Sequence, residues 1–216
     1  MARYLSKVVI ATDDDRIADE ARSFKATVRM TRADHATGSD RVAEVASADS
    51  AEYIVNIQGD EPLIDPSTID ALILSLLGDP EIPMGTLKKR IEMPDEIENP
   101  NVVKVVTDLY GNAIYFSRLP IPAVREAPDR RAAVWFKHIG LYIYKREFLL
   151  GYSSLDPGPL EQVERLEQLR AIENGYKIRV VETEYDSLGV DTPDDLKKVA
   201  ELFQMTEARE LHGGKP

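Results

Sequence analysis

A chain of 216 residues, 43% of them hydrophobic, can bury one sizeable core, so we expect a single domain over residues 1–216. A net charge of −11 argues against nucleic acid or anionic membrane as partners, because phosphate surfaces are bound by a surplus of Lys and Arg. The chain has no cysteine and three histidines, which excludes disulfides and thiolate chemistry and makes zinc a poor fit. With no long apolar stretch and no signal pattern, we expect a cytoplasmic protein.

In the first part of the chain, strand-like runs alternate with helical patterns, as is typical of a parallel sheet covered by helices. The best-defined strand is 53–58, an apolar run that ends in polar residues. Apolar runs predict strands, and apolar residues at helical spacing predict the helices that follow them. The strands are expected at 7–12, 27–31 and 53–58, and the helices at 13–24, 39–48 and 65–77.

From residue 83 the pattern changes to PMGTLKKR, NVVKVVTD and NAIYFSR. Gly111 and Asn112 lie between the last two runs, which predicts an antiparallel hairpin and therefore a mixed sheet. Two further strands and two helices follow. They are expected at 134–145 (strand), 160–174 (helix), 177–183 (strand) and from Thr192 onward (helix).

Acidic residues follow two of the expected strands. Asp60 comes after strand 53–58, and Asp191 comes after strand 177–183. Asp191 also precedes a helix start in which Thr192 and Asp195 form a capping box. In open α/β sheets, ligands bind at the carboxyl ends of strands. Two carboxylates that converge there favour an oxygen-ligated cation, Mg²⁺ first, and a phosphate-bearing substrate. The alternative is that both residues are solvated turn acids.

Seven blocks carry a resemblance to a known family. They read TRADHATGSDRVAEV, YIVNIQGDEPLI, NPNVVKVVTD, GNAIYFSRLPIP, FKHIGLYIYKREFL, PLEQVERLEQLRAIENG and GVDTPDDLKKV, and they extend from about Lys7 to about Phe203. In this order they resemble the CMP-Kdo synthetases, the 3-deoxy-manno-octulosonate cytidylyltransferases.

The resemblance implies a Rossmann-like nucleotidyltransferase fold, with a mixed, mostly parallel sheet flanked by helices and an antiparallel portion for dimerisation and sugar binding. It implies an enzyme that joins CTP and Kdo (3-deoxy-manno-octulosonate) into CMP-Kdo and pyrophosphate for lipopolysaccharide synthesis. Members of the family are usually homodimers.

The resemblance also implies roles for residues near the strand ends. Asp60 and Asp191 would bind Mg²⁺ beside the α-phosphate, and Gln58 would orient the sugar. Lys104 lies among valines, where a buried ammonium needs an anion such as the sugar carboxylate or a phosphate; a snorkelling edge-strand lysine is the alternative. Arg118 is a similar but weaker candidate.

Three further groups are expected to hold substrates. His138 and Tyr142 share one face of their strand, and Gly140 between them leaves room for a ligand; a buried His and a core-edge Tyr are the alternative. Glu164, Glu167 and Gln168 share one side of helix 160–174. The resemblance implies that Glu167 and Gln168 bind sugar hydroxyls, whereas Glu161 and Glu164 are read as a solvated acidic face.

The turn that carries Gly38, Ser39 and Arg41 resembles the family's pyrimidine-contacting turn. The alternative makes Ser39 only an N-cap and Arg41 only a surface residue.

The resemblance fails at the front of the chain. Family members begin with an apolar strand and a basic, glycine-containing loop that holds the triphosphate. In this chain, Lys7 already begins the strand that in the family comes after both of these elements. We therefore expect residues 1–6 to be the end of a helix, in a chain truncated relative to the family. The alternative functions are a non-catalytic homologue, which binds a sugar acid or pairs with a full-length copy, and a cytidylyltransferase for 8-amino-Kdo or sialic acid.

Overall fold

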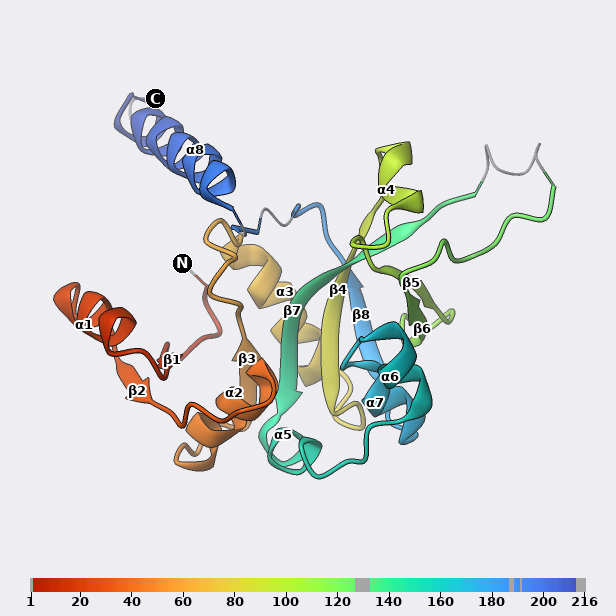
Figure 1. The fold of residues 1–216 in the computed structure, drawn as a ribbon, viewed down its shortest axis with the longest axis horizontal. Coiled ribbons are helices and arrows are strands. Elements are labelled where there is room, and N and C mark those ends of the chain that lie inside the picture. Colours follow the sequence, from red (N-terminus) through yellow and green to blue (C-terminus); the bar gives the residue numbers. More distant parts are fainter. Residues whose placement is uncertain (1, 127–132, 187–188, 191, 213–216) are drawn as a thin grey trace.

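The computed structural model describes residues 2–126, 133–186, 189–190 and 192–212, with the side chains of 204–212 not described (Figure 1). Its main sheet has six strands in this part of the chain, in the order β6-β5-β7-β4-β8, with β3 paired to β7. The strands are β3 (Tyr53–Asn56), β4 (Met84–Arg90), β5 (Lys104–Thr107), β6 (Ala113–Ser117), β7 (Phe136–Lys145) and β8 (Ile178–Glu182).

The sheet is mixed, as the sequence predicts. β4 and β8 are parallel, whereas β7 is antiparallel to β3, β4 and β5, and β5 and β6 form the predicted antiparallel pair. The long strand β7 therefore lies at the centre of the sheet and contacts strands from both parts of the chain.

A second, two-stranded parallel sheet is made by β1 (Ile10–Thr12) and β2 (Val28–Met30), joined by α1 (Asp15–Ser23). In the described part of the chain, neither strand pairs with the main sheet. Figure 1 shows these elements to one side of β3, beyond α2 (Gly38–Ser47).

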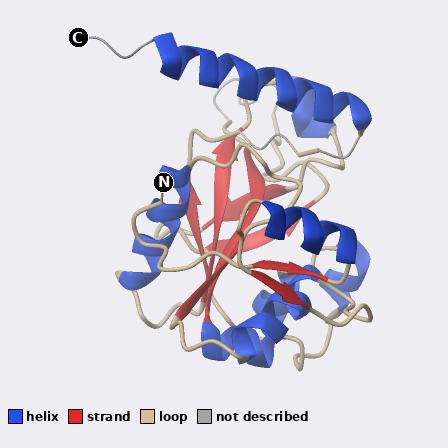
Figure 2. Cartoon of the chain, turned by 90° about the vertical axis from the view of Figure 1, so that its left-hand side faces the viewer, coloured by secondary structure: helices blue, strands red, loops and turns tan. Residues whose placement is uncertain are grey.

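Figure 2 shows helices on both sides of the strands of the main sheet, whereas the C-terminal helix lies beyond one end of the strands (Figure 1). None of the helices in the described residues has the length and apolar character needed to span a bilayer. The helices are α2 (Gly38–Ser47), α3 (Pro66–Leu77), α4 (Pro94–Glu98), α5 (Arg146–Tyr152), α6 (Pro159–Glu164), α7 (Leu169–Glu173) and α8 (Pro193–His212).

Two apolar clusters fill the two faces of the sheet. Because successive side chains of a strand point to opposite faces, β7 divides between them. Ile139, Leu141 and Ile143 pack with the apolar face of α3. Tyr144, on the other face, packs with residues of α2, α5 and α7. The predicted sugar residues His138 and Tyr142 have the same parity as Tyr144 and so belong to this second face.

Local signals explain several helix starts. Thr37 caps α2 in a capping box with Asp40, and Asp65 caps α3 ahead of Pro66. Ser39 is therefore not the N-cap of its helix. The capping box of Thr192 and Asp195 is present, as the sequence predicts.

Two expectations about local structure are wrong. The helix expected over 160–174 is broken into α6 and α7 by Arg165, whose φ of 56° is left-handed. Residues 2–6 are not helical: the backbone N–H groups of Arg3 and Tyr4 donate to the Asp70 carboxylate, and Leu5 packs against the α3 cluster.

Candidate active site

A row of rings covers the face of β7 that carries His138. The ring centroids of His138 and Tyr142 are 5.4 Å apart, those of Tyr142 and Tyr144 5.9 Å, and those of Tyr144 and Tyr152 6.1 Å. Phe116 of β6 contacts His138 edge-on at 5.0 Å. The two predicted sugar residues thus lie side by side in a row of rings that pack against one another.

Burial determines the protonation states of His138 and Tyr142 in this row of rings. Burial lowers the pKa of His138 to about 3, so its imidazole is neutral near pH 7, and burial raises the pKa of Tyr142 well above its usual range. Between these two residues, a Cβ added to Gly140 would meet no atom within 4 Å. The open space predicted at Gly140 is present. A neutral His and a protonated Tyr on either side of it can hydrogen-bond hydroxyl groups.

The predicted nucleotide-binding turn, which carries Gly38 and Ser39, lies close to this row of rings. Ser39 is buried, and its Oγ lies 3.5 Å from the hydroxyl of Tyr144. A Cβ added to Gly38 would lie 3.9 Å from the side-chain amide of Gln58, which follows β3. The structure therefore brings together the turn, Gln58 and the β7 face, as expected if one ligand site spans them.

Arg41 is held away from solvent by polar contacts. Its Nη1 lies 3.1 Å from Asp13 Oδ1 and donates to Thr31 Oγ1 at 2.5 Å. These contacts tie α2 to the ends of β1 and β2. Arg41 is therefore not a simple surface residue, and its contact with a pyrimidine stays a prediction.

The Asp60 region forms a solvent-facing edge of the site. Asp60 is exposed, and within the described residues its carboxylate makes no hydrogen bond or ion pair. The backbone N–H of Val190 donates to the carbonyl of Asp60 at 2.9 Å. Asp191 lies outside the described residues, but its neighbour in sequence contacts Asp60. Among described residues, no group of three or more His, Asp or Glu side chains could hold a metal.

Glu167 and Gln168 lie in the break between α6 and α7. The Tyr152 hydroxyl donates to the Glu167 carbonyl at 2.7 Å, and Gln168 is the N-cap of α7 with 5% of its surface exposed. Burial raises the pKa of the Glu167 carboxyl. Its Oε1 is buried and has no hydrogen-bond partner within the described residues. A buried oxygen without a donor is costly, so a ligand hydroxyl that donates to it would be stabilised.

Glu161 and Glu164 do not form the solvated face that the sequence suggests. Glu161 pairs with Arg170 at 2.6 Å, and both side chains are largely buried. Glu164 accepts hydrogen bonds from Ser117 Oγ at 2.7 Å and from the N–H of Arg118 at 2.9 Å. These carboxylates therefore bind residues of α7 and β6.

Lys104 requires a correction. It is fully buried, and its Nζ donates to the carbonyls of Asn99, Val102 and Arg118 at 2.9, 2.6 and 2.6 Å. An ammonium has three N–H donors, so all are used by the backbone. Burial lowers the pKa of Lys104. In this structure Lys104 joins the loop before β5 to the end of β6 instead of presenting its charge to a substrate anion.

The guanidinium of Arg118 also donates hydrogen bonds to the protein backbone. Its Nε donates to the Glu164 carbonyl at 2.7 Å and its Nη1 to the Pro100 carbonyl at 3.1 Å. Its contact with a substrate stays a prediction, and it would require these bonds to be exchanged.

Sequence reasoning missed Thr86 and Tyr144. Thr86, on β4, is fully buried with its hydroxyl 2.9 Å from His138 Nε2. Tyr144 could have been found by continuing the two-residue period from His138 and Tyr142. Thr86 had no such signal, because its position beside His138 depends on the pairing of β4 with β7.

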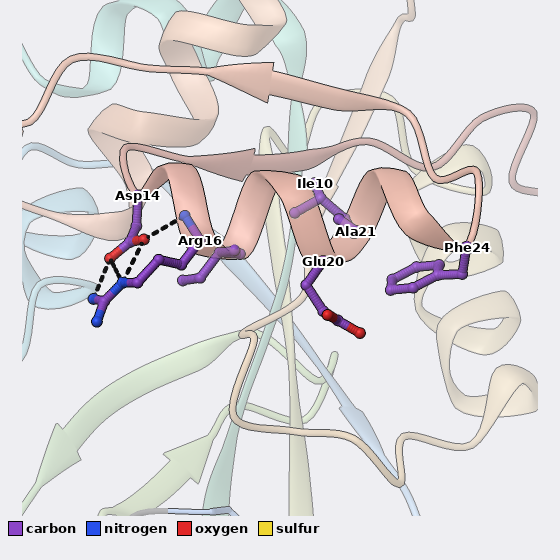
Figure 3. Close-up of a pocket in the computed structure, with 7 residues that line it drawn as sticks. Ile10, Asp14, Arg16, Glu20, Ala21 and Phe24 are labelled. Atoms are coloured by element: carbon purple, nitrogen blue, oxygen red, sulfur yellow. Dashed lines mark hydrogen bonds and ion pairs between the residues drawn. The ribbon is translucent and has the colours of Figure 1, made fainter.

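Two hollows lie outside this site. One, of about 450 Å³, lies along α1 (Figure 3), where Asp14 pairs with Arg16 at 2.5 Å. The other, of about 300 Å³, lies between α3 and the end of β8. None of the predicted site residues lines either hollow.

The comparisons with known proteins agree with this geometry. A family model described as "Cytidylyltransferase" matches residues 2–178. The 3-deoxy-manno-octulosonate cytidylyltransferase of Solibacter usitatus is 64% identical over 99% of this chain and 84% of its own length. Its namesake from Syntrophotalea carbinolica is 56% identical over 92% of this chain and 82% of its own length. A solved structure of CMP:2-keto-3-deoxy-manno-octonic acid synthetase complexed with CTP is 39% identical over 95% of this chain and 84% of that chain, with a TM-score of 0.89.

The mixed sheet flanked by helices, the family model and the close match to a solved synthetase structure together identify the chain as a nucleotidyltransferase. The chain belongs to the cytidylyltransferase family and, within it, to the 3-deoxy-manno-octulosonate cytidylyltransferases.

Proposed function

We propose that this chain transfers the cytidylyl group of CTP to Kdo, forming CMP-Kdo and pyrophosphate for lipopolysaccharide synthesis. One observation carries the proposal: residues expected to bind the nucleotide and residues expected to bind the sugar adjoin in the structure. Ser39 contacts Tyr144 of the row of rings, and Gly38 lies beside Gln58. The names of the relatives, at 52–64% identity, support this choice of substrates.

The reaction needs positioning more than a reactive side chain. The anomeric hydroxyl oxygen of Kdo attacks the α-phosphorus of CTP in line. The bond from that phosphorus to the bridging oxygen breaks, pyrophosphate leaves, and the hydroxyl proton passes to solvent. Gly38 and Ser39 would hold the cytidine. His138 and Tyr142, on either side of the open space at Gly140, would hold sugar hydroxyls.

We propose Asp60 and Asp191 as the residues that hold Mg²⁺. The support is an exposed Asp60 carboxylate, free of partners within the described residues, and the bond from Val190 to the Asp60 backbone. Carboxylate oxygens suit this hard cation. When bound, Mg²⁺ neutralises charge on the phosphates and favours attack on phosphorus. We also propose that the chain forms a homodimer and acts in the cytoplasm, where CTP is made.

The test is pyrophosphate release by the purified chain with CTP and Mg²⁺. We expect release with Kdo above that with sialic acid, and above that with Kdo and UTP. Asp60→Asn should lower turnover by about two orders of magnitude or more, because a ligand carboxylate contributes several kcal/mol of charge stabilisation. Asp95→Asn removes an exposed carboxylate on α4 and should leave turnover unchanged.

Equal release with sialic acid and Kdo would contradict the choice of sugar. Full turnover by Asp60→Asn would contradict the metal site. An absence of pyrophosphate release with every sugar acid, in a chain that still binds Kdo by calorimetry, would support the non-catalytic alternative.

A further inference from the structure

Thr86 lies at an irregularity in the pairing of β4 with β7. Gly85 pairs with Ile143 and Leu87 pairs with Ile139, and the register shifts between these two pairs. The Thr86 hydroxyl lies in this irregular stretch, 3.1 Å from the Ile139 carbonyl and 2.9 Å from the Leu141 carbonyl. It is also 2.9 Å from Nε2 of His138, which is 52 residues away in sequence. Thr86 itself has no exposed surface.

The proton count at this hydroxyl determines the direction of its bond to His138. A Thr hydroxyl donates one hydrogen bond and can accept two, whereas a carbonyl can only accept. If the hydroxyl proton went to Nε2, neither carbonyl would receive it, and a buried carbonyl that loses a donor is destabilised. The proton is therefore directed to the carbonyls of β7, and Nε2 must carry the hydrogen that the Thr86 oxygen accepts.

We propose that Thr86 is a positioning residue that fixes His138 in the Nε2–H tautomer, leaving the Nδ1 lone pair to accept a hydrogen bond from a sugar hydroxyl. The choice of a sugar as the donor rests on the proposed function; the tautomer does not. Within the described residues, no protein group bonds Nδ1.

Two features of the surroundings support this assignment. Phe116 packs edge-on against the imidazole at 5.0 Å and Tyr142 lies at 5.4 Å, so neighbouring rings restrict the ring orientation. Burial lowers the pKa of His138 to about 3, so near pH 7 the ring is neutral and has one N–H to place. Thr86 therefore controls which nitrogen donates and which accepts.

The test uses two-bond ¹H–¹⁵N correlation spectra of the imidazole groups at neutral pH, on the chain without a polyhistidine tag. The sequence has three histidines, and loss of one signal set in His138→Gln assigns His138. We expect the Nε2–H pattern in the natural chain and in Thr86→Ser, which keeps the hydroxyl. We expect Thr86→Val, which has the same shape without the hydroxyl, to show the Nδ1–H form or a mixture.

Kinetics give a second readout. Thr86→Val should raise the KM for Kdo about tenfold while the KM for CTP stays unchanged, because a mispaired imidazole loses about one hydrogen bond to the sugar. Thr86→Ser should keep both constants. A merely structural role would move both constants together and would not change the tautomer of the folded protein.

An Nδ1–H pattern in the natural chain would overturn the proposal, even if Thr86→Val failed to fold. A folded Thr86→Val with an unchanged tautomer and an unchanged KM for Kdo would overturn it as well. An Nε2–H pattern in a chain that does not bind Kdo would support the role of Thr86 and overturn the proposed function, so the two failures are distinguishable.

Discussion

Lys104 is the residue whose position most changes the interpretation of the sequence. Three backbone carbonyls surround its ammonium, and each would lose its donor in Lys104→Met. Because a buried carbonyl left without a donor costs about 1–3 kcal/mol, we expect the free energy of unfolding to fall by at least that amount, measured by urea denaturation.

Lys197→Met is the matched control, since Lys197 lies on the exposed side of α8. It should change the free energy of unfolding by less than about 0.5 kcal/mol. A Lys104→Met variant as stable as the natural chain but unable to bind CTP or Kdo would restore the substrate role predicted from sequence.

His138 makes stability depend on pH. Its pKa is lowered to about 3 in the folded chain, against about 6.5 in an unfolded one. Between these values the unfolded state binds the proton and the folded state does not, so stability falls as pH falls, by at most about 1.4 kcal/mol per pH unit. Urea denaturation from pH 7 to pH 4 should show this slope and show less of it in His138→Gln. Equal slopes in both proteins would mean that folding does not lower the pKa of His138.

At the scale of elements, two glycines on paired strands distinguish packing from ligand space. A Cβ at Gly85 of β4 would lie 2.6 Å from a methyl of Leu76 and 3.0 Å from one of Ile143, so α3 rests directly on this strand. Gly85→Ala should therefore destabilise the fold by about 1–3 kcal/mol.

Gly140 of β7 is the counterpart, because a Cβ there meets nothing within 4 Å. Gly140→Ala should leave the thermal midpoint within a few degrees of the natural chain but raise the KM for Kdo by entering the predicted sugar space. If Gly140→Ala changed neither property, the sugar would have to bind elsewhere.

At the scale of the whole molecule, the β1–α1–β2 unit is the part least supported by the main sheet. Its strands pair only with each other in the described chain, and α1 buries Ala18 and Ala21 while Ile17 and Phe24 stay 53% and 64% exposed. Regions with few buried apolar contacts open with a low free energy. Hydrogen exchange measured by mass spectrometry should therefore be faster for peptides over 10–30 than for peptides over 136–145. Equal protection would show that the two sheets unfold as one unit.

The sequence by itself determined the features that depend on neighbouring residues. Apolar runs located the strands, the capping box of Thr192 and Asp195 located the start of α8, and seven sequence blocks identified the family. The two-residue period correctly placed His138 and Tyr142 on one face. The sequence did not predict the left-handed conformation of Arg165, which breaks the helix, because no glycine, proline or asparagine lies beside this residue.

Only the tertiary structure decided what the buried polar residues contact. Lys104 was expected to seek an anion, but backbone carbonyls, which every residue carries and no sequence pattern marks, surround it instead. Thr86 meets His138 because β4 pairs with β7 across 52 residues and in an irregular register. A side chain's type states which hydrogen bonds it can make, whereas the partner that satisfies them is set by strand order and register, which arise from the packing of the whole chain.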